Sequence, residues 1–155
     1  MQKTSHSKKR ILYCGEFTQL PTGYGVYGHE LLKRLHATGK YEIAEFATYG
    51  TEMDERQFNL PWKYYPNEPG NKNSSEYQEY KKHQINQFGC WRFESVCLDF
   101  KPDVVFSLRD PWMDEYIQTS PFRKFYRRVW MPTVDAEPQT PQWIGSMIDC
   151  DAVLT

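Results

Sequence analysis

The chain has 155 residues, 39% of them hydrophobic, and a formal net charge of −1. This length suits one domain with a single core, and the balanced charge gives no overall field that favours nucleic acid or an anionic membrane. No stretch approaches about 18 uninterrupted apolar residues, and the N-terminus lacks the apolar segment of a signal peptide. We therefore expect a cytoplasmic protein with no transmembrane segment and no nucleic-acid partner.

Residues 1–9 are polar and basic, which predicts a flexible N-terminus ahead of a domain over 10–155. The four cysteines show no C-x-x-C spacing, which favours reduced structural thiols over disulfides or zinc. His29 and His36 lie too far apart on one predicted helix to bind a metal from adjacent turns. We therefore expect no metal site.

Apolar runs alternate with segments of helical periodicity along most of the chain. The predicted strands cover 11–14, 41–49, 103–108, 127–131 and 152–154. The predicted helices cover 25–38, 75–87, 91–100, a segment that begins at Pro111, and 141–148. Gly39 is expected to end the first helix, and Ser75 with Gln78 fits a capping box at the start of the second. Residues 50–74 are polar and rich in proline, and they predict a surface excursion with a short strand at 62–65.

This alternation predicts an α/β fold: a Rossmann-like, open, mostly parallel sheet with helices on both faces. Ligands of such sheets bind outside the carboxyl ends of the strands. The rule nominates three loops as candidate sites, at 15–25, 109–112 and 132–138. The first loop also leads into a helix, whose N-terminus suits a phosphate.

Gly23, Gly25 and Gly28 form a literal G-x-G-x-x-G. A dinucleotide site is one reading of this motif, but seven residues separate Gly15 from Gly23, and the end of the second strand lacks the expected acidic residue. A structural role in tight turns and close helix packing is the other reading.

Carboxylates stand in the other two nominated loops. Asp110 precedes Pro111, so it can cap a helix, or it can hydrogen-bond a polyol substrate and handle its proton. Asp135 and Glu137 share one loop bounded by prolines, where turn chemistry is the alternative explanation for Asp135.

Three segments resemble the N-terminal half of a family 4, GT-B-fold glycosyltransferase. They are ILYCGEFTQLPTGYGVYGHELLKRL, KPDVVFSLRDPWM and MPTVDAEPQTPQWIGSMIDCDAVLT, and the resemblance runs from about Arg10 to Thr155 apart from the excursion. The resemblance implies two Rossmann-like domains that face each other across a cleft. The N-terminal domain binds the acceptor, which is a sugar, a lipid or a protein, and the C-terminal domain binds most of the nucleotide-sugar donor.

The resemblance also implies roles for the nominated residues. Asp110 would contact the transferred sugar as the catalytic residue, and a bulky residue at Gly25 would abolish activity with little unfolding. The loop beside the donor diphosphate would contain Gly23, Tyr24 and Gly25, and the acceptor side would contain Arg109, Trp112, Asp135 and Glu137.

Family members retain the anomeric configuration and need neither a metal nor another cofactor. Their C-terminal domain carries an E-x7-E pair that engages the donor, and this sequence has no such domain. We therefore expect a truncated chain that transfers sugar poorly alone. Two alternatives remain open at this point: a non-catalytic protein-binding or saccharide-binding module that uses the aromatic excursion near Trp62 as its contact surface, and a dinucleotide-dependent enzyme.

Overall fold

Six parallel strands form one open sheet in the order β3-β2-β1-β4-β5-β6. The computed structural model describes residues 8–134 and 137–155. The strands are β1 (Lys9–Glu16), β2 (Tyr41–Thr51), β3 (Lys63–Glu68), β4 (Val104–Arg109), β5 (Arg127–Pro132) and β6 (Ala152–Val153). The predicted α/β class with an open parallel sheet is confirmed.

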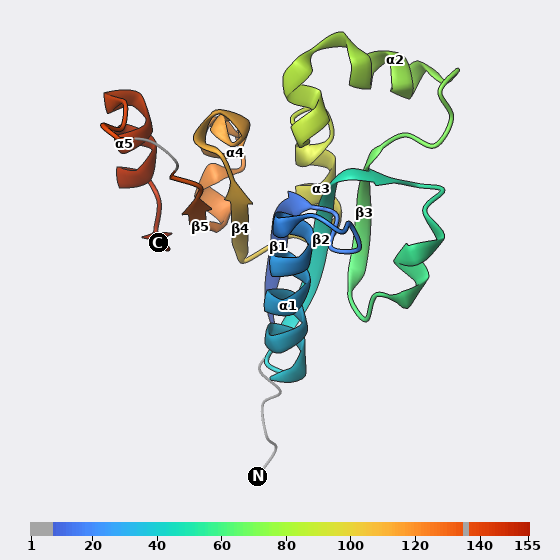
Figure 1. Cartoon of the computed structure of the whole chain (residues 1–155), viewed down its shortest axis with the longest axis horizontal. Helices are drawn as coiled ribbons and strands as arrows, with labels where there is room; N and C mark the ends of the chain where they lie inside the picture. Colours follow the sequence, from blue (N-terminus) through green and yellow to red (C-terminus); the bar gives the residue numbers. More distant parts are fainter. Residues whose placement is uncertain (1–7, 135–136) are drawn as a thin grey trace.

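Helices connect the strands and cover both faces of the sheet (Figure 1). They are α1 (Gly23–Ala37), α2 (Ser75–Lys82), α3 (Phe93–Phe100), α4 (Glu115–Thr119) and α5 (Pro141–Ile148). Short 3₁₀ turns lie at Glu55–Asn59, Gln84–Phe88, Pro111–Met113 and Arg123–Phe125. Within the described ranges, no helix is both long and apolar enough to cross a membrane.

Each face of the sheet buries its own apolar cluster because side chains alternate between faces along a strand. On the α1 face, Tyr13 and Phe106 pack with Leu32 of the helix. The opposite face packs against α3 and α4, with Phe46 and Ile117 among its fully buried members. The central strands are therefore buried on both sides, as their continuous apolar runs indicate.

The helix that follows β1 begins and ends with capping residues. The Thr22 hydroxyl accepts a hydrogen bond from the Gly25 amide at 3.0 Å, which satisfies one free donor of the first turn. Beyond the last turn, Gly39 has a φ of +66°, which confirms it as the residue that ends the helix. Gly28 lets α1 approach β1, since a Cβ there would lie 2.4 Å from the Tyr13 hydroxyl.

The structure corrects three local predictions. The N-terminal segment was expected to be flexible through residue 9, but Lys9 already pairs with Tyr41 in the sheet; residues 1–7 lie outside the described part. The excursion contributes the edge strand β3, which is longer than the predicted strand at 62–65. Ser74, rather than Ser75, caps α2 by accepting from the Tyr77 amide.

Candidate functional site

A cavity opens at the carboxyl edge of the sheet, between the ends of β1, β2 and β4. Because β1 and β4 are neighbours from which the chain winds in opposite directions, this is the switch point where such sheets bind ligands. The lining residues are Glu16, Tyr24, Thr48, Tyr49, Phe88, Leu108, Arg109, Asp110 and Met113. Its volume of about 20 Å³ holds about one water molecule. A larger ligand therefore needs an opposing surface or side-chain movement.

Glu16 ends β1 and faces the first turn of α1. Its carboxylate accepts a hydrogen bond from the Thr22 hydroxyl, the same hydroxyl that caps the helix. The negative charge is favourable there because the N-terminus of a helix is positive. The first turn of α1, which the sequence nominated as a phosphate site, therefore already lies beside a carboxylate of the protein.

The two loop glycines play different parts. A Cβ at Gly25 would lie 2.5 Å from the Leu20 carbonyl oxygen and 3.0 Å from that of Phe17, whereas at Gly23 nothing lies within 4 Å. A side chain at Gly25 would overlap backbone atoms, so we expect its replacement to destabilise the fold, in contrast to the little unfolding expected from the sequence. Gly23 is the position that leaves room for an incoming group.

Asp110 follows β4 and lines the cavity. Its carboxylate accepts a hydrogen bond from the Thr133 hydroxyl, so it joins the loops that follow β4 and β5. Asp110 occupies the N-cap position of the 3₁₀ turn that begins at Pro111, as one reading of the sequence expected, but its side chain makes no capping hydrogen bond to that turn. The carboxylate is instead placed at the ligand edge of the sheet.

Tyr49 is a cavity residue that the sequence analysis did not nominate. Its φ of +63° is uncommon for a side chain of this size, and such backbone strain concentrates at functional sites. Burial, with a further contribution from Glu16, raises the pKa of Tyr49, so its hydroxyl is a hydrogen-bond donor at neutral pH. Its place at the end of β2 was the available signal, because the same rule nominated the ends of the other strands.

Trp112 provides an exposed aromatic surface beside this edge. It lies on the 3₁₀ turn after β4 and is 46% exposed. Its ring meets the cavity residue Phe88 edge to face, with ring centroids 4.9 Å apart. An exposed indole of this kind can pack against the apolar face of a sugar ring, and the indole N–H then stays available as a hydrogen-bond donor.

Arg109 was expected on the acceptor side, but its side chain points into the protein and is 4% exposed. Its guanidinium donates to the Phe88 carbonyl at 2.6 Å, to the Tyr116 hydroxyl at 2.6 Å and to the Thr48 hydroxyl at 2.7 Å. Phe88 and Thr48 line the cavity. Arg109 itself also lines the cavity, so its buried guanidinium positions the cavity walls, and its expected place on the acceptor side stays a prediction.

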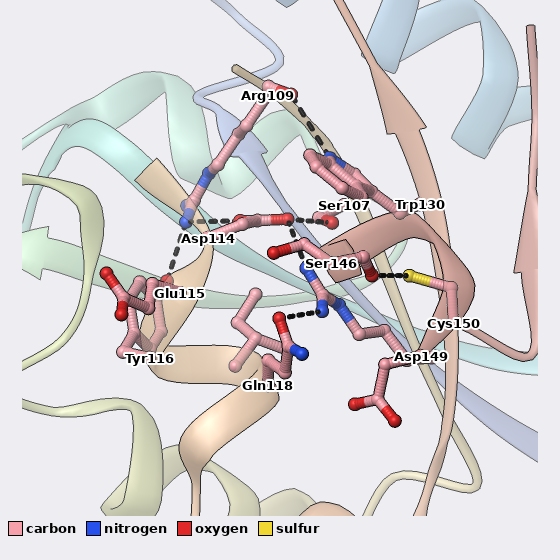
Figure 2. A network of polar contacts seen from close by, with 12 residues as sticks. Ser107, Arg109, Asp114, Glu115, Tyr116, Gln118, Trp130, Ser146, Asp149 and Cys150 are labelled. Atoms are coloured by element: carbon pink, nitrogen blue, oxygen red, sulfur yellow. Dashed lines mark hydrogen bonds and ion pairs between the residues drawn. The ribbon is translucent and has the colours of Figure 1, made fainter. Parts of the chain in front are cut away.

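Asp114 holds this arginine in place (Figure 2). Its carboxylate is fully buried and lies 3.6 Å from Arg109 and 3.9 Å from Arg128, and it accepts a hydrogen bond from Ser107. Burial lowers the pKa of Arg109, but Tyr116 and Asp114 outweigh it and raise the pKa above its ordinary value. Two buried cations on neighbouring strands thus share one carboxylate.

The third nominated loop contributes little to the cavity. Glu137 is exposed and is not among the cavity-lining residues, and Asp135 lies outside the described residues. In the described part of the chain, no three His, Cys, Asp or Glu side chains gather as a metal site. The structure thus brings together Tyr24, Arg109 and Asp110 from the sequence prediction and adds Glu16 and Tyr49.

Fold and cavity together define a doubly wound, parallel α/β protein with a candidate ligand site at its switch point. A scan against protein-family models gives no match for this chain. A search of curated proteins finds no match either.

Proposed function

We propose that this protein is the acceptor-binding domain of a retaining glycosyltransferase that uses a nucleotide-sugar donor. One observation carries the proposal: the carboxylates of Glu16 and Asp110 line one switch-point cavity together with Tyr24 and Tyr49. Carboxylates accept and tyrosine hydroxyls donate hydrogen bonds, which is the complement that vicinal sugar hydroxyls require. Trp112 adds an aromatic surface next to these groups.

In this proposal Asp110 accepts a hydrogen bond from a hydroxyl of the transferred sugar. Its bond from Thr133 fixes the orientation of the carboxylate, and such prior orientation lowers the cost of reaching the transition state. Tyr49 and Tyr24 orient the acceptor from the other side of the cavity. No metal or other cofactor is assigned a role.

The donor diphosphate is proposed to pass the open position at Gly23 while an opposing domain neutralises most of its charge. Two observations support the proposal that the opposing domain, and not the first turn of α1, neutralises most of the diphosphate charge. Glu16 places a negative charge beside the first turn of α1, which weakens that turn as a phosphate site. The cavity alone is also too small to enclose a sugar, so in this proposal a bound sugar lies partly outside it and is covered by a second surface, supplied by a further domain or another chain.

The dinucleotide alternative gains no support from the glycines, because Gly25 and Gly28 face protein atoms that explain their small size. Trp62, around which the contact surface of a binding module was expected, is likewise not available to a partner. Trp62 is 7% exposed, and its indole N–H donates to the buried carboxylate of Glu45 at 2.6 Å. Trp62 thus belongs to the core.

Titration of the chain with monosaccharides and disaccharides, followed by tryptophan fluorescence, tests the proposal because Trp112 adjoins the cavity. We expect saturable binding that weakens about tenfold in Asp110→Asn and in Glu16→Gln, since each loses a charged hydrogen-bond acceptor. Glu30→Gln, an equal charge change on the exposed face of α1, is the matched control. Saccharide binding that ignores both cavity substitutions, or binding of a dinucleotide alone, would overturn the assignment.

A further inference from the structure

A second surface lies at the amino edge of the sheet, opposite the candidate site. The sequence RKFYRR at 123–128 turns there into β5. Phe125 is 78% exposed on this turn, and Leu98 of α3 is 60% exposed. Both border a hollow of about 360 Å³ whose remaining wall is mostly apolar, formed by Cys97, Pro102, Phe122 and Tyr126 with Lys101 and Asp103 at its rim.

Positive charge adjoins this apolar hollow. A hollow of about 740 Å³ lies beside it, shares Asp103, Phe125 and Tyr126 with it, and crosses the amino ends of β1, β4 and β5. The cations that line the two hollows are Lys9, Lys101, Arg123, Lys124 and Arg127, and the acids are Asp103 and Asp151. The surface therefore has a surplus of three positive charges, although the whole chain carries −1.

The two acids pair with some of these cations but do not neutralise them all. Asp103 lies 3.4 Å from Lys9, and Asp151 lies 3.3 Å from Arg123 and 2.8 Å from Arg127. The side chains of Lys9 and Arg127 remain 72% and 78% exposed. Among the described residues, Lys124 makes no ion pair. These cations can therefore reach a second charged surface without breaking the fold.

We infer that this amino-edge surface binds an anionic phospholipid membrane, with Phe125 and Leu98 inserted at the headgroup level. Aromatic and aliphatic side chains flanked by Lys and Arg are what an interfacial site uses, because the apolar groups leave water and the cations meet lipid phosphates. The cations are spread over three strand ends, which fits a fluid layer of headgroups. A nucleic acid would leave Leu98 exposed, and a single acidic peptide would reach only part of the charge.

This inference is independent of the proposed activity, and it adds an orientation. The strands of Figure 1 run from the amino edge at the bottom to the carboxyl edge at the top. A membrane at the amino edge would therefore leave the switch-point cavity facing water. The net charge of the whole chain did not indicate this surface, because the surplus of positive charge is confined to the amino edge.

The test is cosedimentation of the full chain with phosphatidylcholine vesicles that contain either no phosphatidylserine or about 30 mol% of it. We expect binding only to the anionic vesicles, with a large decrease when salt rises from about 0.1 to about 0.5 M. Leu98→Ala combined with Phe125→Ala should lower the partition coefficient at least about tenfold, because two apolar side chains lose their burial. Lys124→Gln combined with Arg127→Gln should lower it by a similar factor.

Matched control variants distinguish binding through this surface from nonspecific adsorption to vesicles. Met53→Ala combined with Phe58→Ala removes two apolar side chains that are 75% and 81% exposed elsewhere, and it should leave binding unchanged. Lys33→Gln combined with Arg34→Gln is the corresponding charge control on α1. The inference would be overturned if the chain bound neutral and anionic vesicles equally, or if the control variants lost as much binding as the site variants. It would also be overturned if an oligonucleotide or a polyglutamate peptide bound the chain more tightly than anionic vesicles do.

Discussion

Gly25 shows how a single missing side chain sets the geometry of the first loop. The backbone carbonyls of Phe17 and Leu20 approach the position that a Cβ would occupy there. Three residues later, Gly28 is similarly close to Tyr13, which itself lies against Gly15. Gly15 of β1 and Gly25 and Gly28 of α1 therefore fix how α1 packs on β1, and with it the positions of Glu16 and Tyr24.

Replacing Gly25 with alanine should destabilise the protein by about 1–3 kcal/mol, because the added methyl group overlaps backbone atoms that cannot move aside. Gly23→Ala is the matched control on the same turn. Its side chain would meet open space, so the free energy of unfolding should change by no more than about 0.5 kcal/mol. Urea unfolding measures both variants, and equal effects would contradict the difference drawn between the two positions.

Glu45 predicts a pH dependence of stability. Its buried carboxylate accepts hydrogen bonds from the Thr18 amide, the Thr18 hydroxyl and the Trp62 indole. Burial nevertheless raises the pKa of Glu45 above its ordinary value of 4.5. In the window between the unfolded and folded pKa values, the folded chain keeps a proton that the unfolded chain has released. The free energy of unfolding should therefore fall as pH rises through that window.

Denaturant unfolding at a series of pH values above 4.5 measures this fall in the wild type. Glu45→Gln removes the titrating group and should flatten the curve there. A variant whose curve keeps the full wild-type slope would show that other groups cause the dependence.

At the scale of elements, the buried network ties four segments together. Arg109 connects β4 with the end of β2 and with the turn before Gly89, and Asp114 connects it with Arg128 of β5. Three of these segments, β4, the end of β2 and the turn before Gly89, also line the cavity. Their relative positions therefore depend on one shared carboxylate.

Asp114→Asn should cost about 3–5 kcal/mol in the free energy of unfolding, because it leaves two buried guanidinium groups with a neutral partner. The matched control is Glu30→Gln, which removes the exposed carboxylate that pairs with Lys33 and Arg34. An exposed pair of this kind contributes at most about 1 kcal/mol. Thermal unfolding distinguishes the two variants. If Asp114→Asn lowered the free energy of unfolding by less than about 1 kcal/mol, the buried network would not stabilise the fold as described.

Sequence patterns predicted most elements because apolar periodicity is a local property. They did not predict that the Arg109 side chain is buried, although a signal was present. Counting by two from the buried residue Val105 places Ser107 and Arg109 on the same inward face of β4. Asp114, the carboxylate that makes this inward position tolerable, belongs to a different element, and no local pattern links the two.

The edge strand was predicted only in part for a similar reason. Pro66 argues against a strand, but β3 lies at the edge of the sheet, where a missing amide donor is tolerated. Its place beside β2 is set by tertiary contacts, among them the hydrogen bond between Trp62 and Glu45. Strand order and the residues that meet in the cavity depend on such contacts.

For the whole molecule, the two edges of the sheet differ in character. The carboxyl edge gathers Glu16, Asp110 and aromatic side chains around a small cavity, and the amino edge gathers cations around an apolar hollow. This division supports a sugar-binding edge directed away from a charged surface. It also explains why an overall charge near zero carries little information about partners.

Two-dimensional amide NMR of the chain, titrated with a saccharide and separately with a nucleoside diphosphate, tests the central claim most directly. We expect the saccharide to shift the amide resonances of Glu16, Tyr24, Tyr49, Asp110 and Trp112, and the diphosphate alone to bind more weakly because the Glu16 carboxylate repels it. Saccharide shifts that are absent, or that fall away from the carboxyl edge, would contradict the assignment of this edge as an acceptor site.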